Sequence, residues 1–234
     1  MQLRAVLFDL DNTLIDFLRL KRAASDAAGR AMIAAGADFP FSADEAGDIL
    51  FGDYLQDIEG DDVFERFLKQ HHRQKLSLSQ HHVDRITAAA VNAYLRAKLL
   101  NLEPYPGVRR TLLHLARLGI KMGVVTDAPR FKAYQRLDGS GLADFFETVI
   151  THTDHGEHKP HERPFLDALD ALGTQPQETL MVGDWPERDL EGARSVGLRT
   201  AWARYGSHHA DDLVEADFEL ASFSDLKRVV GLRA

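Results

Sequence analysis

The chain contains no cysteine, and this absence removes three kinds of chemistry at once. Disulfide bridges, thiolate metal sites and a cysteine nucleophile are all excluded. Long apolar runs are absent too, since no window approaches the ~18 consecutive apolar residues that a membrane-spanning helix needs. The first apolar run ends at Asp9, which is too early for a secretory signal. We therefore expect a cytoplasmic protein that does not enter a membrane.

Basic side chains are in the minority, with 28 Lys and Arg against 36 Asp and Glu and a net charge of -8. A chain with this balance repels polyanions, so nucleic acid is not an expected partner. A small anionic substrate stays compatible, because one local positive site can override the overall sign. Hydrophobic residues make up 44% and charged residues 27%, which is typical of a globular protein of one large or two small domains.

Short apolar segments rich in β-forming residues alternate with helical patterns along most of the chain. The segments expected to be strands are 3–8, 120–125, 148–150, 179–182 and 200–202. The apolar stripes expected to be helical are Val108, Leu112 and Leu115; Phe165, Ala168, Leu169 and Leu172; and Leu226, Val229 and Val230. This alternation predicts an α/β fold, in which helices cover both faces of a parallel sheet.

Residues 16–100 break the alternation, because no strand pattern occurs there. Two apolar stripes at helical spacing are Leu20, Ala24, Ala27, Ala31 and Ala34, and Ile86, Ala90, Ala93 and Ala97. The stiff segment Pro104-Tyr105-Pro106-Gly107 then ends the helical region. We therefore predict a core domain of residues 1–15 and 101–234, with an all-helical domain of residues 16–100 inserted after the first strand.

Polar side chains follow four of the predicted strands. They are Asp9 and Asp11 after the first strand, Thr126 and Asp127 after the second, Lys159 in the loop after the third, and Asp184 and Asp189 after the fourth. In an open parallel sheet, ligands bind beyond the carboxyl ends of the strands, so these side chains are expected to meet. Clustered carboxylates suit Mg²⁺, and a carboxylate can also be a nucleophile. Lysine and threonine supply the charge and hydrogen bond that a phosphoryl group needs.

Four segments, in this order, resemble the motifs of the haloacid dehalogenase-like hydrolase superfamily. They are Phe8-Asp9-Leu10-Asp11-Asn12-Thr13-Leu14, Val125-Thr126-Asp127, Lys159-Pro160, and Gly183-Asp184 followed by Asp189. The resemblance covers nearly the whole chain, since the helical insertion lies where the phosphatase branch carries its small helical (C1-type) cap. It implies a Rossmann-like core and a helical cap domain.

The resemblance also implies roles for the first and last of these motifs. Asp9 corresponds to the nucleophile, and Asp11 to the general acid and base. Mg²⁺ would be held by Asp9, Asp184 and the backbone carbonyl of Asp11. Asp189 would orient Lys159 or a metal-bound water.

The resemblance further implies that Thr126 and Lys159, in the two middle motifs, bind the phosphate group. Asp127 belongs to the same substrate-binding loop, where many relatives carry asparagine or serine, and this difference can alter the contacts of the loop. Together these implications describe a Mg²⁺-dependent phosphatase that acts on a small phosphorylated metabolite through an aspartyl-phosphate. We expect a monomer or a homodimer.

Three alternatives share this fold. A phosphomutase on a small sugar phosphate would use the same Asp9 and Asp11. A haloacid dehalogenase would need no metal, and Asp11 argues against it, because the resembling dehalogenases lack an acidic residue there. A binding protein without activity would have no need for the intact Asp9, Asp11, Lys159 and Asp184.

Several residues near these motifs have two interpretations. His152, His155, His158 and His161 could form a transition-metal site, but an exposed loop is the favoured interpretation, because no metal-binding template fits their spacing. Trp185 could line the mouth of a substrate site or simply pack. Asp16 could touch substrate or cap the next helix.

Overall fold

The structure is a computed structural model that describes residues 3–56, 62–73, 79–208 and 214–231. The chain divides into two compact units. Met1–Asp16 and Glu103–Ala234 form one, called the core unit here, and Phe17–Leu102 form the other, called the helical unit. No helix in the described residues is both long and apolar enough to cross a bilayer.

The core unit is built on a six-stranded sheet with the order β3-β2-β1-β4-β5-β6, and all of its pairings are parallel. The strands are β1 (Ala5–Phe8), β2 (Lys121–Thr126), β3 (Thr148–Thr151), β4 (Thr179–Gly183), β5 (Arg199–Ala203) and β6 (Phe218–Leu220). The predicted α/β fold is confirmed as a Rossmann-like parallel sheet. Strand β6 was not predicted, because Glu219 at its centre interrupts the apolar run by which the other strands were identified.

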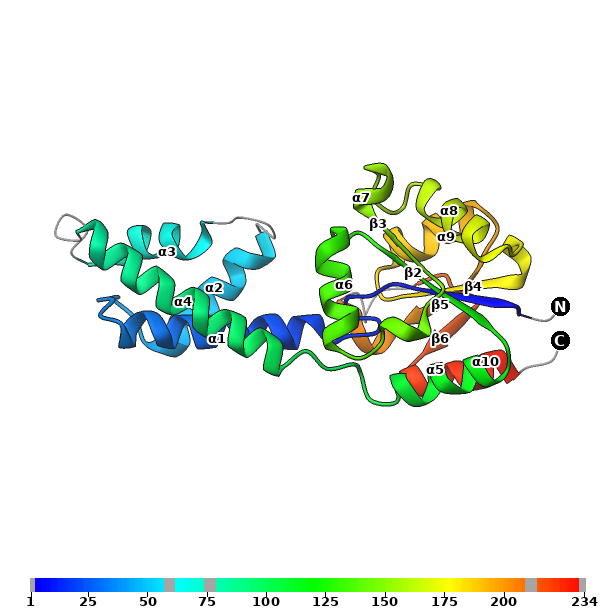
Figure 1. The fold of residues 1–234 in the computed structure, drawn as a ribbon, viewed down its shortest axis with the longest axis horizontal. Coiled ribbons are helices and arrows are strands. Elements are labelled where there is room, and N and C mark those ends of the chain that lie inside the picture. The colour runs from blue at the N-terminus through cyan, green and yellow to red at the C-terminus, as the bar shows by residue number, and fades with distance from the viewer. Residues whose placement is uncertain (1–2, 57–61, 74–78, 209–213, 232–234) are drawn as a thin grey trace. The chain divides into compact units, whose positions relative to one another are not determined.

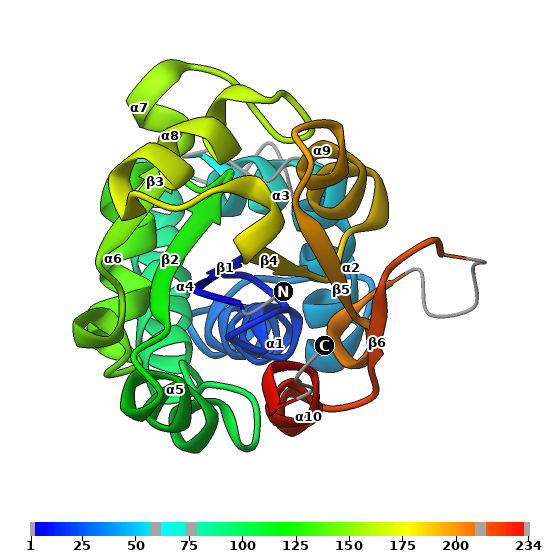
Figure 2. The ribbon, with the colours of Figure 1, turned by 90° about the vertical axis from the view of Figure 1, so that its right-hand side faces the viewer.

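Helices cover both faces of this sheet (Figure 2). They are α5 (Val108–Arg117), α6 (Arg130–Gly139), α7 (His152–His155), α8 (Arg163–Leu172), α9 (Glu191–Ser195) and α10 (Leu226–Gly231). Figure 2 shows α8 and α9 on one face and α5 and α10 on the other.

Strand β1 is buried by side chains from both of these layers. Its Leu7 belongs to an apolar cluster with Phe165 of α8. On the opposite face the ring of Phe8 stacks on Phe223, just before α10, at a centroid distance of 5.8 Å. Every side chain of β1 is therefore buried, which explains why this strand is a continuous apolar run rather than an alternating one.

The order of the strands creates a switch point beside β1. The chain moves from β1 to β2 and β3 on one side, and then crosses back to place β4 on the other side of β1. Phe8, the last residue of β1, is in register with Val124 of β2 and Val182 of β4. The loops that follow β1, β2 and β4 therefore emerge side by side, at the position where open α/β sheets bind their ligands.

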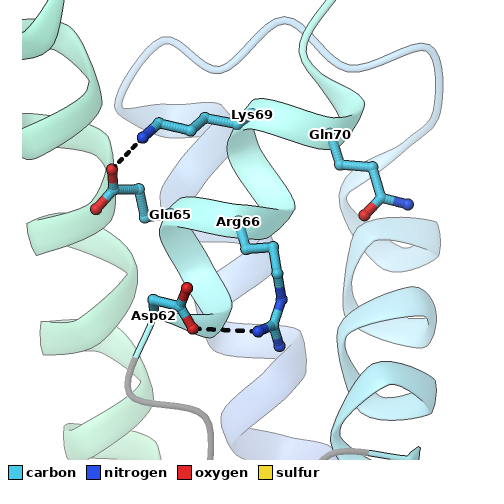
Figure 3. Close-up of a pocket in the computed structure, with 5 residues that line it drawn as sticks. All are labelled: Asp62, Glu65, Arg66, Lys69 and Gln70. Carbon is cyan, nitrogen blue, oxygen red and sulfur yellow. Dashed lines mark hydrogen bonds and ion pairs between the residues drawn. The ribbon is translucent and has the colours of Figure 1, made fainter.

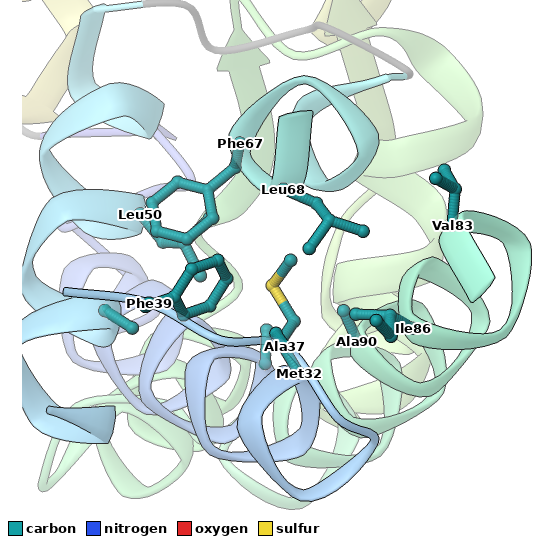
Figure 4. Packing of buried hydrophobic residues seen from close by; sticks show 11 residues of the cluster. Met32, Ala37, Phe39, Leu50, Phe67, Leu68, Val83, Ile86 and Ala90 are labelled. Atoms are coloured by element: carbon teal, nitrogen blue, oxygen red, sulfur yellow. The ribbon is translucent and has the colours of Figure 1, made fainter. Parts of the chain in front are cut away.

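The helical unit consists of α1 (Phe17–Ala34), α2 (Ala43–Gln56), α3 (Val63–His71) and α4 (Gln80–Leu100) within the described residues (Figure 1). Met32 of α1, Leu50 of α2, Phe67 and Leu68 of α3 and Ile86 of α4 converge on one apolar core (Figure 4). A Cβ on Gly29 would lie 2.8 Å from the backbone nitrogen of Gly47, so these glycines permit the close approach of α1 and α2.

The apolar stripe predicted for α1 is only partly right. Leu20 and Ala24 are buried, but the buried row continues through Ala28 and Met32, whereas Ala34 is exposed and Ala27 and Ala31 are half-buried. The reason is that α1 packs along a ridge of residues spaced by four, the common geometry between neighbouring helices. In α4, Ile86 and Ala90 are buried as predicted, while Ala93 and Ala97 are half-buried.

The two chain segments that lead into and out of the helical unit run beside each other within the core unit. Ile15 forms an antiparallel bridge with Pro104, and the backbone nitrogen of Tyr105 donates to the carbonyl of Leu14 at 3.0 Å. Asp16 comes immediately before α1. Both connections therefore lie within a few residues of the loop that follows β1.

The packing of the core unit gives a direct stability prediction. Phe165 is 0% exposed, whereas Phe131 on α6 is 77% exposed. Phe165→Ala removes a buried ring and leaves a cavity, so we expect it to lower the free energy of unfolding by about 3–5 kcal/mol. The matched variant Phe131→Ala is expected to change it by less than about 0.5 kcal/mol. Urea denaturation measures both, and equal losses would contradict this assignment of the core.

Candidate active site

A buried ammonium lies at the centre of the carboxyl edge of the sheet. The Lys159 Nζ donates to Asp9 Oδ1 at 2.5 Å, to Asp189 Oδ1 at 2.6 Å and to the carbonyl of Val125 at 3.0 Å. Its side chain is 3% exposed, and the three acceptors match its three protons. Burial alone would lower the pKa of Lys159, but the charges of Asp189 and Asp9 outweigh it and raise that pKa. The lysine is therefore a fixed positive charge.

Asp9 extends the pairing of β1 by one residue, because its backbone nitrogen donates to the carbonyl of Val182 at 2.9 Å. Its side chain is buried, and this burial raises the pKa of Asp9 to about 8. Lys159 opposes that shift, while the charges of Asp189 and Asp11 add to it. At neutral pH the carboxyl group of Asp9 is therefore protonated unless a cation stabilises its ionised form.

Asp184 comes directly after β4 and is held from two sides. Thr13 Oγ1 donates to Asp184 Oδ1 at 2.9 Å, and the indole nitrogen of Trp202 donates to the Asp184 carbonyl at 3.3 Å. Burial raises the pKa of Asp184 well above its usual range, and the negative charges of Asp9 and Asp189 raise it further.

The carboxylates of Asp9, Asp184 and Asp189 form a compact acidic cluster among the described residues, with one oxygen of each within 4.8 Å of the others. Asp189 already accepts from Lys159 through Oδ1 and from the backbone nitrogen of Trp185 through Oδ2, at 3.0 Å. An all-oxygen set of buried, mutually repelling carboxylates suits a hard divalent cation. The cluster thus has the chemistry of a magnesium site, with Asp189 tied to Lys159.

The loop after β1 is held by residues that follow the carboxyl end of β5. Asn12 has a φ of 58°, a left-handed conformation that asparagine tolerates. The Tyr205 hydroxyl donates to the carbonyl of Thr13 at 2.6 Å. A Cβ on Gly206 would lie 1.7 Å from the carbonyl oxygen of Asn12, so only glycine fits there. Sequence reasoning missed Tyr205 and Gly206, since they carry no motif.

The Asp11 side chain meets an arginine that the sequence analysis also missed. Arg136 Nη1 donates to Asp11 Oδ2 at 2.5 Å, and Arg136 is 6% exposed on α6. Nothing in the sequence distinguishes Arg136 from the other charged residues of α6, which are mostly exposed.

Thr126 is the last residue of β2, one residue later than the predicted end of that strand, and Asp127 follows it. Thr126 is buried, and its hydroxyl accepts from the backbone nitrogen of Ala128 at 3.2 Å. Asp127 Oδ1 accepts from the backbone nitrogen of Lys159 at 2.9 Å, and Asp127 Oδ2 lies 3.4 Å from Arg188 Nη1. The carboxylate of Asp127 therefore anchors the Lys159 loop to the end of β2.

Exposed rings lie beside this anchor. Trp185 is 40% exposed, and the guanidinium of Arg188 lies over its ring at 4.1 Å from the centroid. The rings of His152 and His158 stack at 3.9 Å, and His161 is exposed. The side chain of His155 lies outside the described residues. Within the described part of the chain, no histidine joins a cluster able to hold a metal ion.

A hollow on the surface of the helical unit has no comparable chemistry. It is lined by Asp62, Glu65, Arg66, Lys69 and Gln70 (Figure 3). Asp62 and Arg66 pair at 3.1 Å, and Glu65 pairs with Lys69, so its charges neutralise one another along a single helix. The acidic cluster of the core unit is therefore the stronger candidate for the active site.

Comparison with known proteins identifies relatives of the chain. The family model for haloacid dehalogenase-like hydrolases matches residues 3–197. The chain is 34% identical to a glyceraldehyde 3-phosphate phosphatase of Methanopyrus kandleri, covering 97% of each protein. It is 32% identical to the enzyme of the same name from Pyrococcus furiosus, over 96% of this chain and 88% of the relative. A crystal structure of a HAD phosphatase from Thermococcus onnurineus matches with a TM-score of 0.60 and 28% identity, over 99% of this chain and 98% of that one.

The raised pKa of Asp9 predicts how stability depends on pH without a cation. The folded protein keeps a proton on Asp9 up to about pH 8, whereas the unfolded chain releases it near the ordinary value of 3.8. Folding therefore takes up a proton between these values, and the free energy of unfolding falls as pH rises through this window. Asp184 acts in the same direction.

Urea denaturation in excess chelator at pH 6 and pH 8 tests this prediction. Asp9→Asn is expected to reduce the pH slope, because the amide does not titrate in this range. Added Mg²⁺ is expected to stabilise the wild type more at pH 8 than at pH 6, since the cation replaces the proton. Identical slopes for the wild type and Asp9→Asn would contradict the prediction.

Proposed function

The chain belongs to the haloacid dehalogenase-like hydrolase family, and from this membership we propose that it is a Mg²⁺-dependent phosphatase that works through an aspartyl-phosphate at Asp9. The observation that carries the proposal is the buried ammonium of Lys159, held between the carboxylates of Asp9 and Asp189. A fixed positive charge beside a buried carboxylate is the arrangement that a phosphoryl group and its attacking oxygen require.

In the first step, a carboxylate oxygen of Asp9 attacks the phosphorus atom. The bond from phosphorus to the leaving oxygen breaks, and the carboxyl group of Asp11 gives its proton to that oxygen. In the second step, the Asp11 carboxylate takes a proton from water while the water oxygen bonds to phosphorus. The bond between Asp9 and phosphorus then breaks, which releases inorganic phosphate and restores both aspartates.

Mg²⁺ would be held by Asp9, Asp184 and the backbone carbonyl of Asp11, and when bound it supplies positive charge that favours the ionised form of Asp9. Thr126 and Lys159 bind the phosphate group. Asp189 keeps the ammonium of Lys159 in place, and Asp127 keeps the backbone of Lys159 in place. Asp127 therefore acts on substrate through the loop that it anchors.

The substrate is a compact phosphate monoester of the size of a triose phosphate. Two relatives that match nearly the whole chain are named for glyceraldehyde 3-phosphate. The helical unit acts as a cap, because both of its connections lie beside the Asp9–Asp11 loop in the core unit. A module attached there can exclude bulk water and supply side chains that recognise the leaving group.

Substitution of the nucleophile tests the chemistry. Asp9→Asn is nearly isosteric, so we expect it to fold normally and to reduce phosphate release to background. The matched control Asp170→Asn, at an exposed position on α8, is expected to retain full activity. Chelation is expected to abolish activity of the wild type and Mg²⁺ to restore it, while Ca²⁺ binds and inhibits. Turnover that persists in excess chelator, or in Asp9→Asn, would refute this mechanism.

Removal of the helical unit tests its role as a cap. We expect that replacing residues 17–100 with a short flexible linker leaves weak hydrolysis of an aryl phosphate. Selectivity among small phosphorylated metabolites is expected to disappear, so that their kcat/KM values converge. Circular dichroism establishes that the shortened protein is folded. An unchanged order of kcat/KM values in a folded protein would show that the helical unit does not determine specificity.

A further inference from the structure

Arg136 is a buried charge inside a helix of the core unit. It lies on α6 between the buried residues Ala133 and Leu137, and its side chain is 8% exposed. Arginine is rarely buried to this extent unless its charge is paired. Its ion-pair partner is Asp11, on the loop after β1, at 2.5 Å. The arginine thus joins the element after β2 to the loop that carries the nucleophile.

The backbone and the side chain of this loop are held by different elements. Tyr205 and Gly206, beyond β5, contact the carbonyl groups of Thr13 and Asn12 and thereby fix the backbone. Arg136, from the opposite side of β1, contacts the side chain of Asp11.

We propose that Arg136 is a positioning residue, which fixes the Asp11 carboxylate in the orientation that exchanges a proton with the leaving-group oxygen and with the attacking water. This inference rests on the proposed function. An aspartate side chain samples several staggered rotamers, and a directional contact from a guanidinium selects one of them. Small losses of alignment are costly in proton transfer, because the reacting groups must meet at hydrogen-bond distance.

The proposal predicts an effect that depends on the leaving group. An alkyl phosphate releases a strongly basic alkoxide, which needs a proton from Asp11 as the bond to phosphorus breaks. The leaving group of 4-nitrophenyl phosphate is far less basic and departs without that proton. Loss of alignment at Asp11 therefore slows phosphoryl transfer from the alkyl substrate to Asp9 much more than transfer from the aryl substrate, whereas a general loss of folded enzyme slows both equally.

The experiment compares kcat/KM for glyceraldehyde 3-phosphate with kcat/KM for 4-nitrophenyl phosphate in each variant, because kcat/KM reports phosphoryl transfer to Asp9 and excludes the later attack of water that both substrates share. Arg136→Met and Arg136→Gln remove the charge, and we expect the alkyl-to-aryl ratio of kcat/KM to fall about tenfold or more, with the roughly 10²–10⁴ that general acid catalysis supplies as the upper limit. Arg136→Lys is expected to recover part of the ratio, because it restores the charge without the planar fork.

Arg109→Met is the matched control. Arg109 Nη2 donates to the carbonyl of Ser140 at 2.6 Å, so it anchors the end of the same helix without contacting Asp11. This variant is expected to keep the wild-type ratio even if its stability falls. Because the ratio is measured on one preparation, the fraction of folded enzyme cancels.

Asp11→Asn separates this inference from the proposed function. We expect that variant to lower the alkyl-to-aryl ratio by itself, and Arg136→Met to add nothing further in its background. If Asp11→Asn leaves the ratio unchanged, the proposed acid–base role of Asp11 fails. The other outcome is that Asp11→Asn lowers the ratio, while a folded Arg136→Met or Arg136→Gln enzyme keeps the wild-type ratio. In that case Arg136 does not position Asp11, and the proposed function stands.

Discussion

The ion-pair network of Lys159 is the interaction on which the rest of this site depends. Three buried carboxylates beyond the end of a sheet repel one another, and burial makes each charge more costly. The ammonium of Lys159 offsets that cost by contacting Asp9 and Asp189 directly, while the carbonyl of Val125 takes its third proton. Removing the lysine would leave uncompensated buried charge, which proteins tolerate poorly. Positive charge from a cation completes the balance when the carboxylates are ionised.

The parallel sheet makes this network possible, because it brings residues that are far apart in the sequence to a single edge. Strand β1 lies between β2 and β4; β2 ends at Thr126, and Asp9 and Asp184 come directly after β1 and β4. Lys159 arrives from the connection between β3 and α8, where Asp127 holds its backbone nitrogen. The segments that lead into and out of the helical unit, at Ile15 and Pro104, pair with each other in the core unit close to the loop after β1.

Much of this arrangement could be predicted from the sequence for a simple reason. The strands of a parallel sheet are buried on both faces, so they appear as apolar runs, and the polar residues after each run are the ones that meet. Asp9, Lys159, Asp184 and Asp189 were therefore predictable as neighbours. The helical pattern of residues 17–100 was equally clear, although the exact buried row of α1 was set by its packing against α2 and α4.

The supporting contacts could not be predicted, because they depend on the three-dimensional path of the chain rather than on local pattern. Arg136 resembles its exposed neighbours on α6, and only the fold turns it toward Asp11. Gly206 carries no motif, and its need for glycine arises from the approach of Asn12 across the sheet edge. Asp127 lies in the expected loop, but its contact with the backbone nitrogen of Lys159 joins two loops that are 32 residues apart in the sequence.

The proposed mechanism requires a covalent phosphoryl group on the carboxylate of Asp9, and chemical trapping detects this group directly. The enzyme is mixed with substrate, quenched in acid during turnover and treated with borohydride, which reduces an acyl phosphate to an alcohol. Peptide mass spectrometry then locates the modified residue. We predict reduction of Asp9 to homoserine in the wild type and its absence when substrate is omitted. Reduction at another carboxylate, or an unmodified Asp9 while phosphate is being released, would contradict the mechanism.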